Sequence, residues 1–151
     1  MCVMADYKLL GKQIESLAEE SNGLVPIMAN ASALLFQALP DINWAGFYLV
    51  QDERLLLGPF QGKVACVRIA KGRGVCGTAW ETDTTQVVPD VHAFPGHIAC
   101  DSASRSEIVV PIHCDGKVIA VLDIDSPSLD RFTEADREGL EAFVKTIENI
   151  L

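Results

Sequence analysis

The sequence predicts one α+β domain, a largely antiparallel sheet with helices packed against it. Three observations lead to this fold class. Apolar residues recur at helical spacing near both ends of the chain, and strand-like patterns dominate the middle. Asp115-Gly116 lies between two apolar runs and is a strong hairpin signal. A length of 151 residues is enough for about one domain, and no repeat or interdomain linker divides it.

Two helices are predicted before the first strand. In residues 6–20, Leu10 and Ile14 share one helical face. Apolar residues recur at helical spacing again from about Pro26 to Leu39, and Pro40 stops this second helix. Both apolar faces are expected to pack into the core rather than to line a ligand site.

Strands make up most of the remaining chain. The predicted strands cover residues 42–50, 54–58, 64–69, 86–88, 107–112 and 118–124. In the third strand, alternation places Val64, Cys66 and Arg68 on one face. A short helix is predicted over residues 75–81, between the third and fourth strands. A final helix is predicted from Thr133, where a capping-box-like pattern precedes an apolar helical face.

Charge and composition restrict the function classes. The chain has 21 acidic and 12 basic side chains, a formal net charge of -9. This charge repels phosphate backbones and anionic membranes, so neither is an expected partner. No segment approaches the ~20 apolar residues of a membrane span, and no signal peptide is recognised. A cytoplasmic location is expected, where the five cysteines are unlikely to form permanent disulfides.

Residues 91–102 carry many chemically active side chains. Pro95 and Gly96 prevent this segment from forming a regular element. It contains two of the three histidines and a cysteine, and loops on a rigid scaffold often carry binding and catalytic groups. Cys100 is therefore the leading candidate for a functional residue. The alternative is a small buried apolar side chain.

Three cysteines suggest thiol chemistry. Cys66, Cys76 and Cys100 are widely spaced, and no Cys-x-x-Cys pair is present. A metal site that combined them with His92 and His97 would rest on ligand types alone. A pair of thiols that cycles fits a reducing compartment better, because one thiolate attacks an electrophile and a second thiol resolves the product.

Three acidic residues form a second candidate group. Asp123 and Asp125 are two apart in a strand, so their side chains leave the sheet on the same face. Buried carboxylates need partners or a cationic ligand, and a solvent-exposed strand end is the alternative. A two-residue turn would pair Glu107 with Ile124 and place Glu107 on the opposite face. The three acids converge only with a three-residue loop, a bulge, or a Glu107 that precedes the ladder.

Aromatic residues form the third candidate group. Strand alternation places Trp44, Gly46 and Tyr48 on one face. The two rings beside a glycine would form the wall of a small pocket, against which a cation or a sulfur atom of a ligand packs. From spacing alone, burial in the core is the favoured interpretation.

Several longer motifs stand in one order between about residue 40 and the C-terminus. They are NWAGFY (43–48), LGPFQG (57–62) with AC (65–66), GRGVCGTA (72–79), FPGHIACDS (94–102), SEIV (106–109) and LDIDS (122–126). Together they resemble the free methionine-(R)-sulfoxide reductases, a family built on a GAF fold. The resemblance implies a single GAF-like domain over residues 1–151, a six-stranded antiparallel sheet, no metal or other cofactor, and a homodimer. Cys2 and Cys114 lie outside the family pattern.

The resemblance also implies roles for the three motif cysteines. Cys100 becomes the attacking cysteine, Cys66 its resolving partner and Cys76 a second thiol. Attack on free methionine sulfoxide would release methionine and leave a sulfenic acid on Cys100. Cys66 would condense with it to a disulfide, which thioredoxin would reduce.

The remaining candidates would form the substrate pocket. By the same resemblance, Glu107, Asp123 and Asp125 become its polar wall, while Trp44 and Tyr48 become its aromatic side. A sulfoxide oxygen needs a proton as the thiolate approaches sulfur, so an acid must lie nearby. The acids would also bind the α-ammonium group, which only the free amino acid carries.

Two functions from other classes remain alternatives. A non-catalytic GAF sensor would bind a small ligand or nucleotide without turnover and without need of Cys100. A metal-binding regulator would retain zinc through purification. The presence of all three motif cysteines argues for the reductase.

Overall fold

A computed structural model describes residues 5–18, 23–97 and 102–151 of the chain. Its six strands form one sheet in the order β3-β2-β1-β6-β5-β4, and all neighbouring strands are antiparallel. The strands are β1 (Trp44–Gln51), β2 (Arg54–Gly62), β3 (Arg68–Ala70), β4 (Gln86–Val88), β5 (Ser106–Cys114) and β6 (Lys117–Ser126). The helices are α1 (Tyr7–Ala18), α2 (Leu24–Ala38), α3 (Gly74–Thr82) and α4 (Glu134–Ile150), with a 3-10 helix at Val91–Ala93. The predicted α+β fold class and antiparallel sheet are confirmed.

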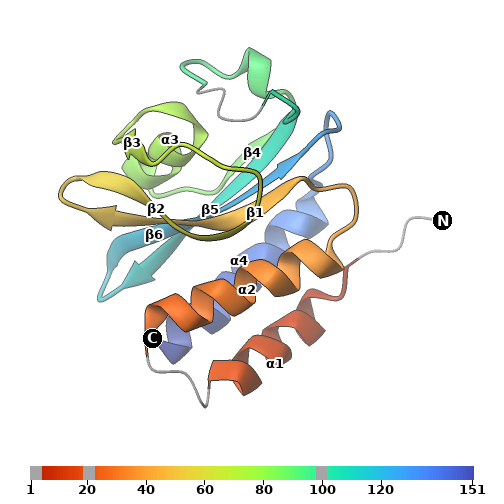
Figure 1. The fold of residues 1–151 in the computed structure, drawn as a ribbon, viewed down its shortest axis with the longest axis vertical. Coiled ribbons are helices and arrows are strands. Elements are labelled where there is room, and N and C mark those ends of the chain that lie inside the picture. The colour runs from red at the N-terminus through yellow and green to blue at the C-terminus, as the bar shows by residue number, and fades with distance from the viewer. Residues whose placement is uncertain (1–4, 19–22, 98–101) are drawn as a thin grey trace.

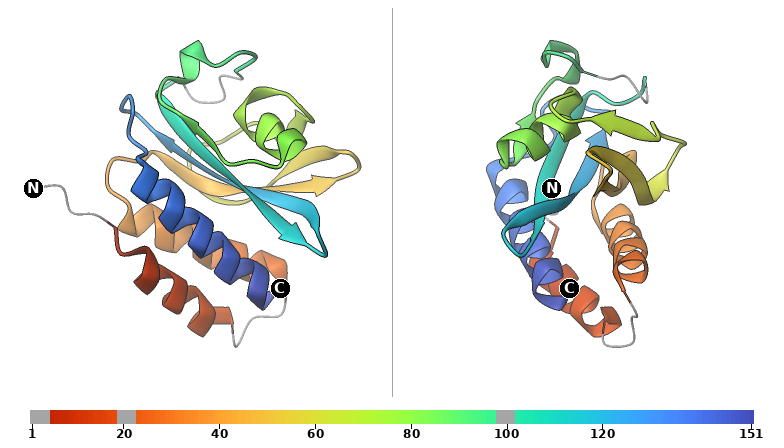
Figure 2. Two further views of the ribbon diagram at one scale, coloured as in Figure 1. Left: turned by 180° about the vertical axis from the view of Figure 1, so that it is seen from behind. Right: turned by 90° about the vertical axis from the view of Figure 1, so that its left-hand side faces the viewer.

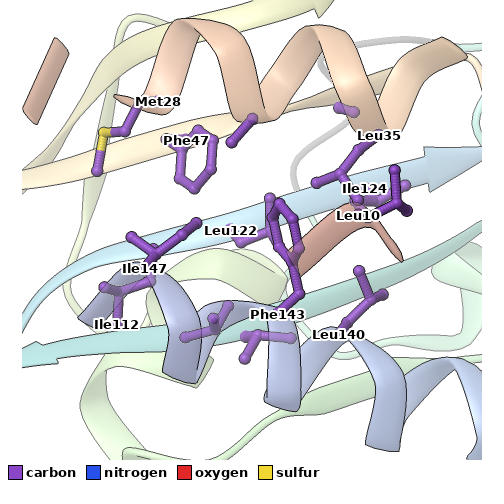
Figure 3. Packing of buried hydrophobic residues seen from close by; sticks show 14 of the residues in the cluster. Leu10, Met28, Leu35, Phe47, Ile112, Leu122, Ile124, Leu140, Phe143 and Ile147 are labelled. Atoms are coloured by element: carbon purple, nitrogen blue, oxygen red, sulfur yellow. The ribbon is translucent and has the colours of Figure 1, made fainter. Parts of the chain in front are cut away.

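The sheet is covered on both faces, by different elements. Helices α2 and α4 lie against one face, α1 packs on the side of these two helices away from the sheet, and α3 lies on the other face (Figures 1 and 2). The larger core fills the space between the sheet and the three helices, where Phe47, Leu122 and Phe143 meet (Figure 3). A smaller apolar cluster surrounds α3 on the opposite face. The candidate acids and aromatic residues belong to this second face.

The two ends of the chain are joined through the start of α4. The predicted capping box is confirmed, because Thr133 Oγ1 accepts a hydrogen bond from the Asp136 backbone N–H and Asp136 accepts one from the Thr133 backbone N–H. Asp136 also accepts a 2.7 Å hydrogen bond from the Tyr7 hydroxyl of α1. It forms an ion pair with Arg131 at 3.0 Å. None of the described helices is long and apolar enough to span a membrane.

The turn between β5 and β6 has the predicted two residues. Asp115 and Gly116 have φ angles of 52° and 76°, as a type I′ hairpin turn requires. Cys114 pairs directly with Lys117 across it. The sequence signal therefore identifies this turn correctly.

A β-bulge follows the turn and changes the register. His113 pairs with Val118, but Ile112 pairs with Ala120, so Ile119 is an extra residue in β6. Every residue beyond this point is shifted by one relative to a regular two-residue hairpin. A bulge is one of the three conditions under which the three acids can share a face.

The predicted strand over residues 64–69 is wrong in its first part, since β3 begins only at Arg68. The Trp44 indole N–H donates to the Lys63 carbonyl at 3.1 Å, and the Tyr48 hydroxyl donates to the Cys66 carbonyl at 2.9 Å. These side-chain donors occupy carbonyls that a sheet ladder would otherwise use. Residues 64–67 therefore form a connection outside the strands, and the predicted shared face of Val64, Cys66 and Arg68 does not exist.

His113 on β5 is held between carboxylates from two helical segments. Its Nε2 lies 2.5 Å from Asp83 Oδ1 after α3, and its Nδ1 lies 2.9 Å from Glu148 Oε2 of α4. Partial burial alone would lower the pKa of the imidazole. The hydrogen bonds and charges of the two carboxylates outweigh burial and raise this pKa above its usual value.

We expect the His113→Asn protein to be less thermally stable than the wild type, mainly in mildly acidic solution. A raised folded-state pKa stabilises the fold fully below the unfolded value of about 6.5, and this contribution is lost as the pH rises through the folded-state pKa. Melting temperatures of both proteins across this pH range check the prediction. Glu148→Gln should reduce the same pH-dependent difference, and a difference that does not vary with pH would contradict the assignment.

Candidate functional site

A small cavity lies between the sheet and the amino end of α3. Its volume is about 50 Å³, more than the ~10–15 Å³ that one water molecule needs on the same measure. The lining residues come from β1, β3, β5, β6, α3 and the connections beside them. They are Trp44, Tyr48, Val64, Ala65, Ile69, Arg73, Gly74, Val75, Cys76, His97, Ser104, Glu107, Asp123 and Asp125. The cavity thus brings together both aromatic candidates, all three acids and one of the three motif cysteines.

The bulge places the three acids on one face of the sheet. Beyond it, Glu107 of β5 pairs with Asp125 of β6, while Asp123 pairs with Val109. Glu107 and Asp123 are 7% and 5% exposed, so both carboxyl groups are removed from water. The register problem that a regular hairpin poses is therefore resolved by the extra residue in β6.

Burial changes the protonation of this acid group. Burial, followed by the charges of Asp123 and Asp125, raises the pKa of Glu107 well above its usual value. Burial also raises the pKa of Asp123, although hydrogen bonds from Glu107 and Cys76 partly oppose this. Asp123 Oδ1 has no hydrogen-bond partner within the described part of the chain. The group can therefore hold a proton and still offer an acceptor to a ligand.

Cys76 of α3 is a buried free thiol beside these acids. Its Sγ lies 4.0 Å from Glu107 Oε2. Burial, then the charges of Asp123 and Glu107, raises the pKa of this thiol and favours its protonated form. Ligand atoms of Cys76, Glu107 and Asp123 lie within 4.8 Å of one another, so within the described ranges these residues are the ones that could hold a metal ion. They differ from the cysteine–histidine set that the sequence offered.

Trp44 and Tyr48 serve both as core and as cavity wall. They are 3% and 2% exposed, and their ring centroids lie 6.0 Å apart in a stacked arrangement. Phe60 stacks on Trp44 at 5.1 Å. A Cβ atom at Gly46 would lie 2.3 Å from Phe60, so only glycine lets this ring approach. The two interpretations of the aromatic group, pocket and core, therefore both apply.

The same two aromatic residues position the segment that carries Cys66. Their hydrogen bonds to the carbonyls of residues 63 and 66 hold this segment over the cavity, and Val64 and Ala65 line it. Cys66 is disulfide-bonded, whereas Cys76 and Cys114 are free. Cys100 lies outside the described residues.

The amino end of α3 is a feature of the site that the sequence analysis missed. Gly74, Val75 and Cys76 begin this helix and line the cavity together with Arg73. Free backbone N–H groups and the helix dipole at such an end favour an anionic group. The Gly-Arg-Gly sequence before a predicted helix was the available signal. His97 and Ser104 also line the cavity without having been predicted to do so.

Comparison with known proteins identifies the family. Residues 17–151 match the model of the GAF domain. The chain is 52% identical to the free methionine-R-sulfoxide reductase of Escherichia coli, over 96% of this chain and 88% of that protein. A solved structure of fRMsr of Staphylococcus aureus in complex with substrate has a TM-score of 0.94 at 55% identity, covering 100% of this chain and 99% of that one.

This chain belongs to the free methionine-R-sulfoxide reductase family. It is also 55% identical to protein YtsP of Bacillus subtilis, over 97% of this chain and 91% of that protein. The resemblance inferred from the sequence motifs is confirmed, and so is the GAF fold. The acid-lined cavity is therefore the candidate active site of an oxidoreductase of this family.

We expect the buried acids of this reductase to lower its stability at neutral pH. Because folding raises the pKa values of Glu107 and Asp123, the unfolded chain releases these protons first, and stability falls as the pH rises above about 4. Asp123→Asn should therefore raise the melting temperature near neutral pH by about 2–4 °C, the shift that ~1 kcal/mol gives a domain of this size. Calorimetry checks this, with exposed Glu138→Gln as the control. A lower melting temperature in the Asp123→Asn protein would contradict the prediction.

Proposed function

We propose that the protein reduces free L-methionine-(R)-sulfoxide to L-methionine. The observation that carries this proposal is the acid-lined cavity, in which buried Glu107 and Asp123 face the aromatic wall beside the Cys66 segment. The E. coli relative and the substrate-bound S. aureus structure support the same substrate class. In this proposal residues 1–151 act as a single GAF-like domain without a metal or other cofactor.

Substrate recognition follows from the charges around the cavity. The carboxyl groups of Asp123 and Asp125 are suited to bind the α-ammonium group, and the amino end of α3 with Arg73 is suited to bind the α-carboxylate. The rings of Trp44 and Tyr48 offer an apolar surface to the methyl group and sulfur. A peptide-bound methionine sulfoxide lacks the α-ammonium group that these carboxyl groups would bind.

Glu107 is suited to be the proton donor. Its raised pKa favours a protonated carboxyl group near neutral pH, which a sulfoxide oxygen needs when sulfur is attacked. Asp123 lies within hydrogen-bonding reach and would orient that proton. Cys76, whose own pKa is raised, is a poorer nucleophile than an exposed thiol and would serve as the second thiol of the site.

The proposed reaction uses two further cysteines. The Cys100 thiolate attacks the substrate sulfur, the oxygen passes to Cys100, and methionine leaves. Cys66 then attacks the resulting sulfenic acid, which releases water and forms the disulfide Cys66–Cys100. Reduced thioredoxin returns two electrons and two protons and restores both thiols. The disulfide-bonded state of Cys66 is consistent with this cycle. A cytoplasmic homodimer completes the proposal.

We expect single-turnover experiments to separate the cysteine roles. Without reductant, wild-type protein and Cys66→Ser should each release about one methionine per chain, because sulfenic acid formation precedes resolution. Cys100→Ser should release none, since a serine alkoxide is scarcely populated near neutral pH. Cys76→Ser is the matched control at a cavity thiol.

Two outcomes would contradict this assignment. Release of about one equivalent by Cys100→Ser would end its role as nucleophile. Absence of turnover in wild type, with thioredoxin or dithiothreitol present, would favour a non-catalytic GAF sensor instead.

We also expect strong selection for the free amino acid. N-acetylation removes the ammonium charge and leaves the buried acids unpaired, so kcat/KM for the blocked substrate should fall by at least about 100-fold. The opposite sulfur epimer should also react poorly, because its oxygen points away from the donor. Methionine release measured for the three substrates checks this, and comparable rates for free and blocked substrate would remove the recognition role of the acids.

A further inference from the structure

Two exposed valines flank the disulfide-bonded Cys66. Val64 is 87% exposed and Val67 is 56% exposed, whereas Cys66 between them is half-buried. Single exposed apolar side chains are common on protein surfaces, but two that flank a disulfide sulfur offer apolar contact to a molecule that approaches this sulfur. The segment from residue 63 to residue 68 therefore has the character of a contact surface.

The charge of this region is opposite to that of the whole protein. In a chain of net charge -9, residues 63–80 contain four basic side chains and no acidic one. These basic residues are Lys63, Arg68, Lys71 and Arg73, and all four are exposed. Two acidic side chains lie beside them, Glu81 next to Gly72 and Asp52 in the hollow that Arg68 lines, so basic groups still outnumber acidic ones here. A surplus of basic charge near the Cys66 segment attracts a partner with an acidic surface and orients its approach.

The backbone of this segment is held in place at three points. The Lys63 and Cys66 carbonyls accept the Trp44 and Tyr48 hydrogen bonds, and the Val67 carbonyl accepts a 2.9 Å hydrogen bond from the Leu57 N–H. A partner that docks here would meet a largely preformed surface and would lose little free energy in ordering it.

We propose that residues 63–68 form the docking surface for a protein dithiol reductase with an acidic rim, and that this reductase attacks Cys66. The proposal rests on the proposed function, which requires a disulfide to be reduced after each turnover. A small thiol needs neither the exposed valines nor the basic rim. A protein dithiol would use both, the valines for apolar contact and the basic side chains for approach.

The electron balance assigns a distinct fate to each sulfur. The reductase thiolate attacks Cys66 Sγ, and the bond between Cys66 and its partner, Cys100 in the proposed cycle, breaks. The electron pair leaves on Cys100 as a thiolate, which restores the nucleophile at once. The second reductase thiol then attacks the mixed disulfide and releases Cys66. The reductase is oxidised by two electrons, and this chain is reduced by two.

The first test compares two reductants on the oxidised protein. Val67→Asp and Arg68→Glu should each lower the second-order rate of disulfide reduction by thioredoxin about tenfold or more, because each places a negative charge before an acidic rim. Reduction by dithiothreitol should stay within about twofold of wild type, since a small neutral dithiol makes no such contact. Val25→Asp and Lys12→Glu are matched controls on the helices of the opposite sheet face.

The second test maps the attacked sulfur. A thioredoxin that lacks its resolving cysteine should be trapped as a mixed disulfide with Cys66, which peptide mass spectrometry identifies. Attachment to Cys100, unchanged thioredoxin rates in both variants, or equal losses with both reductants would overturn the proposal. Because this assay follows the disulfide without methionine sulfoxide, failure of the proposed activity would be seen separately, as absence of methionine release with either reductant.

Discussion

The burial of Glu107 and Asp123 beside each other is the constraint on which the rest of the site depends. Burial raises the pKa of both carboxyl groups, and this favours a proton held between them. This arrangement is unfavourable for the folded state and useful for chemistry, because it keeps a proton donor and an acceptor together beside a largely buried cavity. The bulge at Ile119 makes the arrangement possible, since a regular hairpin would turn Glu107 to the other side of the sheet.

The sheet separates stability from function by its two faces. On one face, Phe47 and Leu122 pack with α1, α2 and α4 into a core that contains none of the candidate site residues in the described ranges. On the other face, the same strands present Tyr48 and Asp123 to the cavity under α3. Because neighbouring residues of a strand point to opposite sides, Tyr48 lies between Phe47 and Leu49, and Asp123 lies between Leu122 and Ile124, all four of which belong to the main core or pack against it. The site is thus rigid without being part of the main core.

Trp44 and Tyr48 connect the substrate cavity to the redox segment. Their rings form a wall of the cavity, while their polar atoms hold the carbonyls of Lys63 and Cys66. A buried aromatic side chain with one polar atom needs a hydrogen-bond partner, and here the segment that carries the cysteine supplies it. The pocket wall and the position of Cys66 are therefore fixed by the same side chains.

The sequence by itself determined the features that depend on local chemistry. The capping box at Thr133, the turn at Asp115-Gly116, the common face of Asp123 and Asp125, and the family all followed from residues close together in the chain. Only the tertiary structure decided the bulge at Ile119, the loss of strand structure over residues 64–67, and the amino end of α3 as a cavity wall. Each of these results from a partner that is distant in sequence, such as a neighbouring strand or an indole N–H that binds a carbonyl. Propensity and spacing describe only what a segment prefers in the absence of such partners.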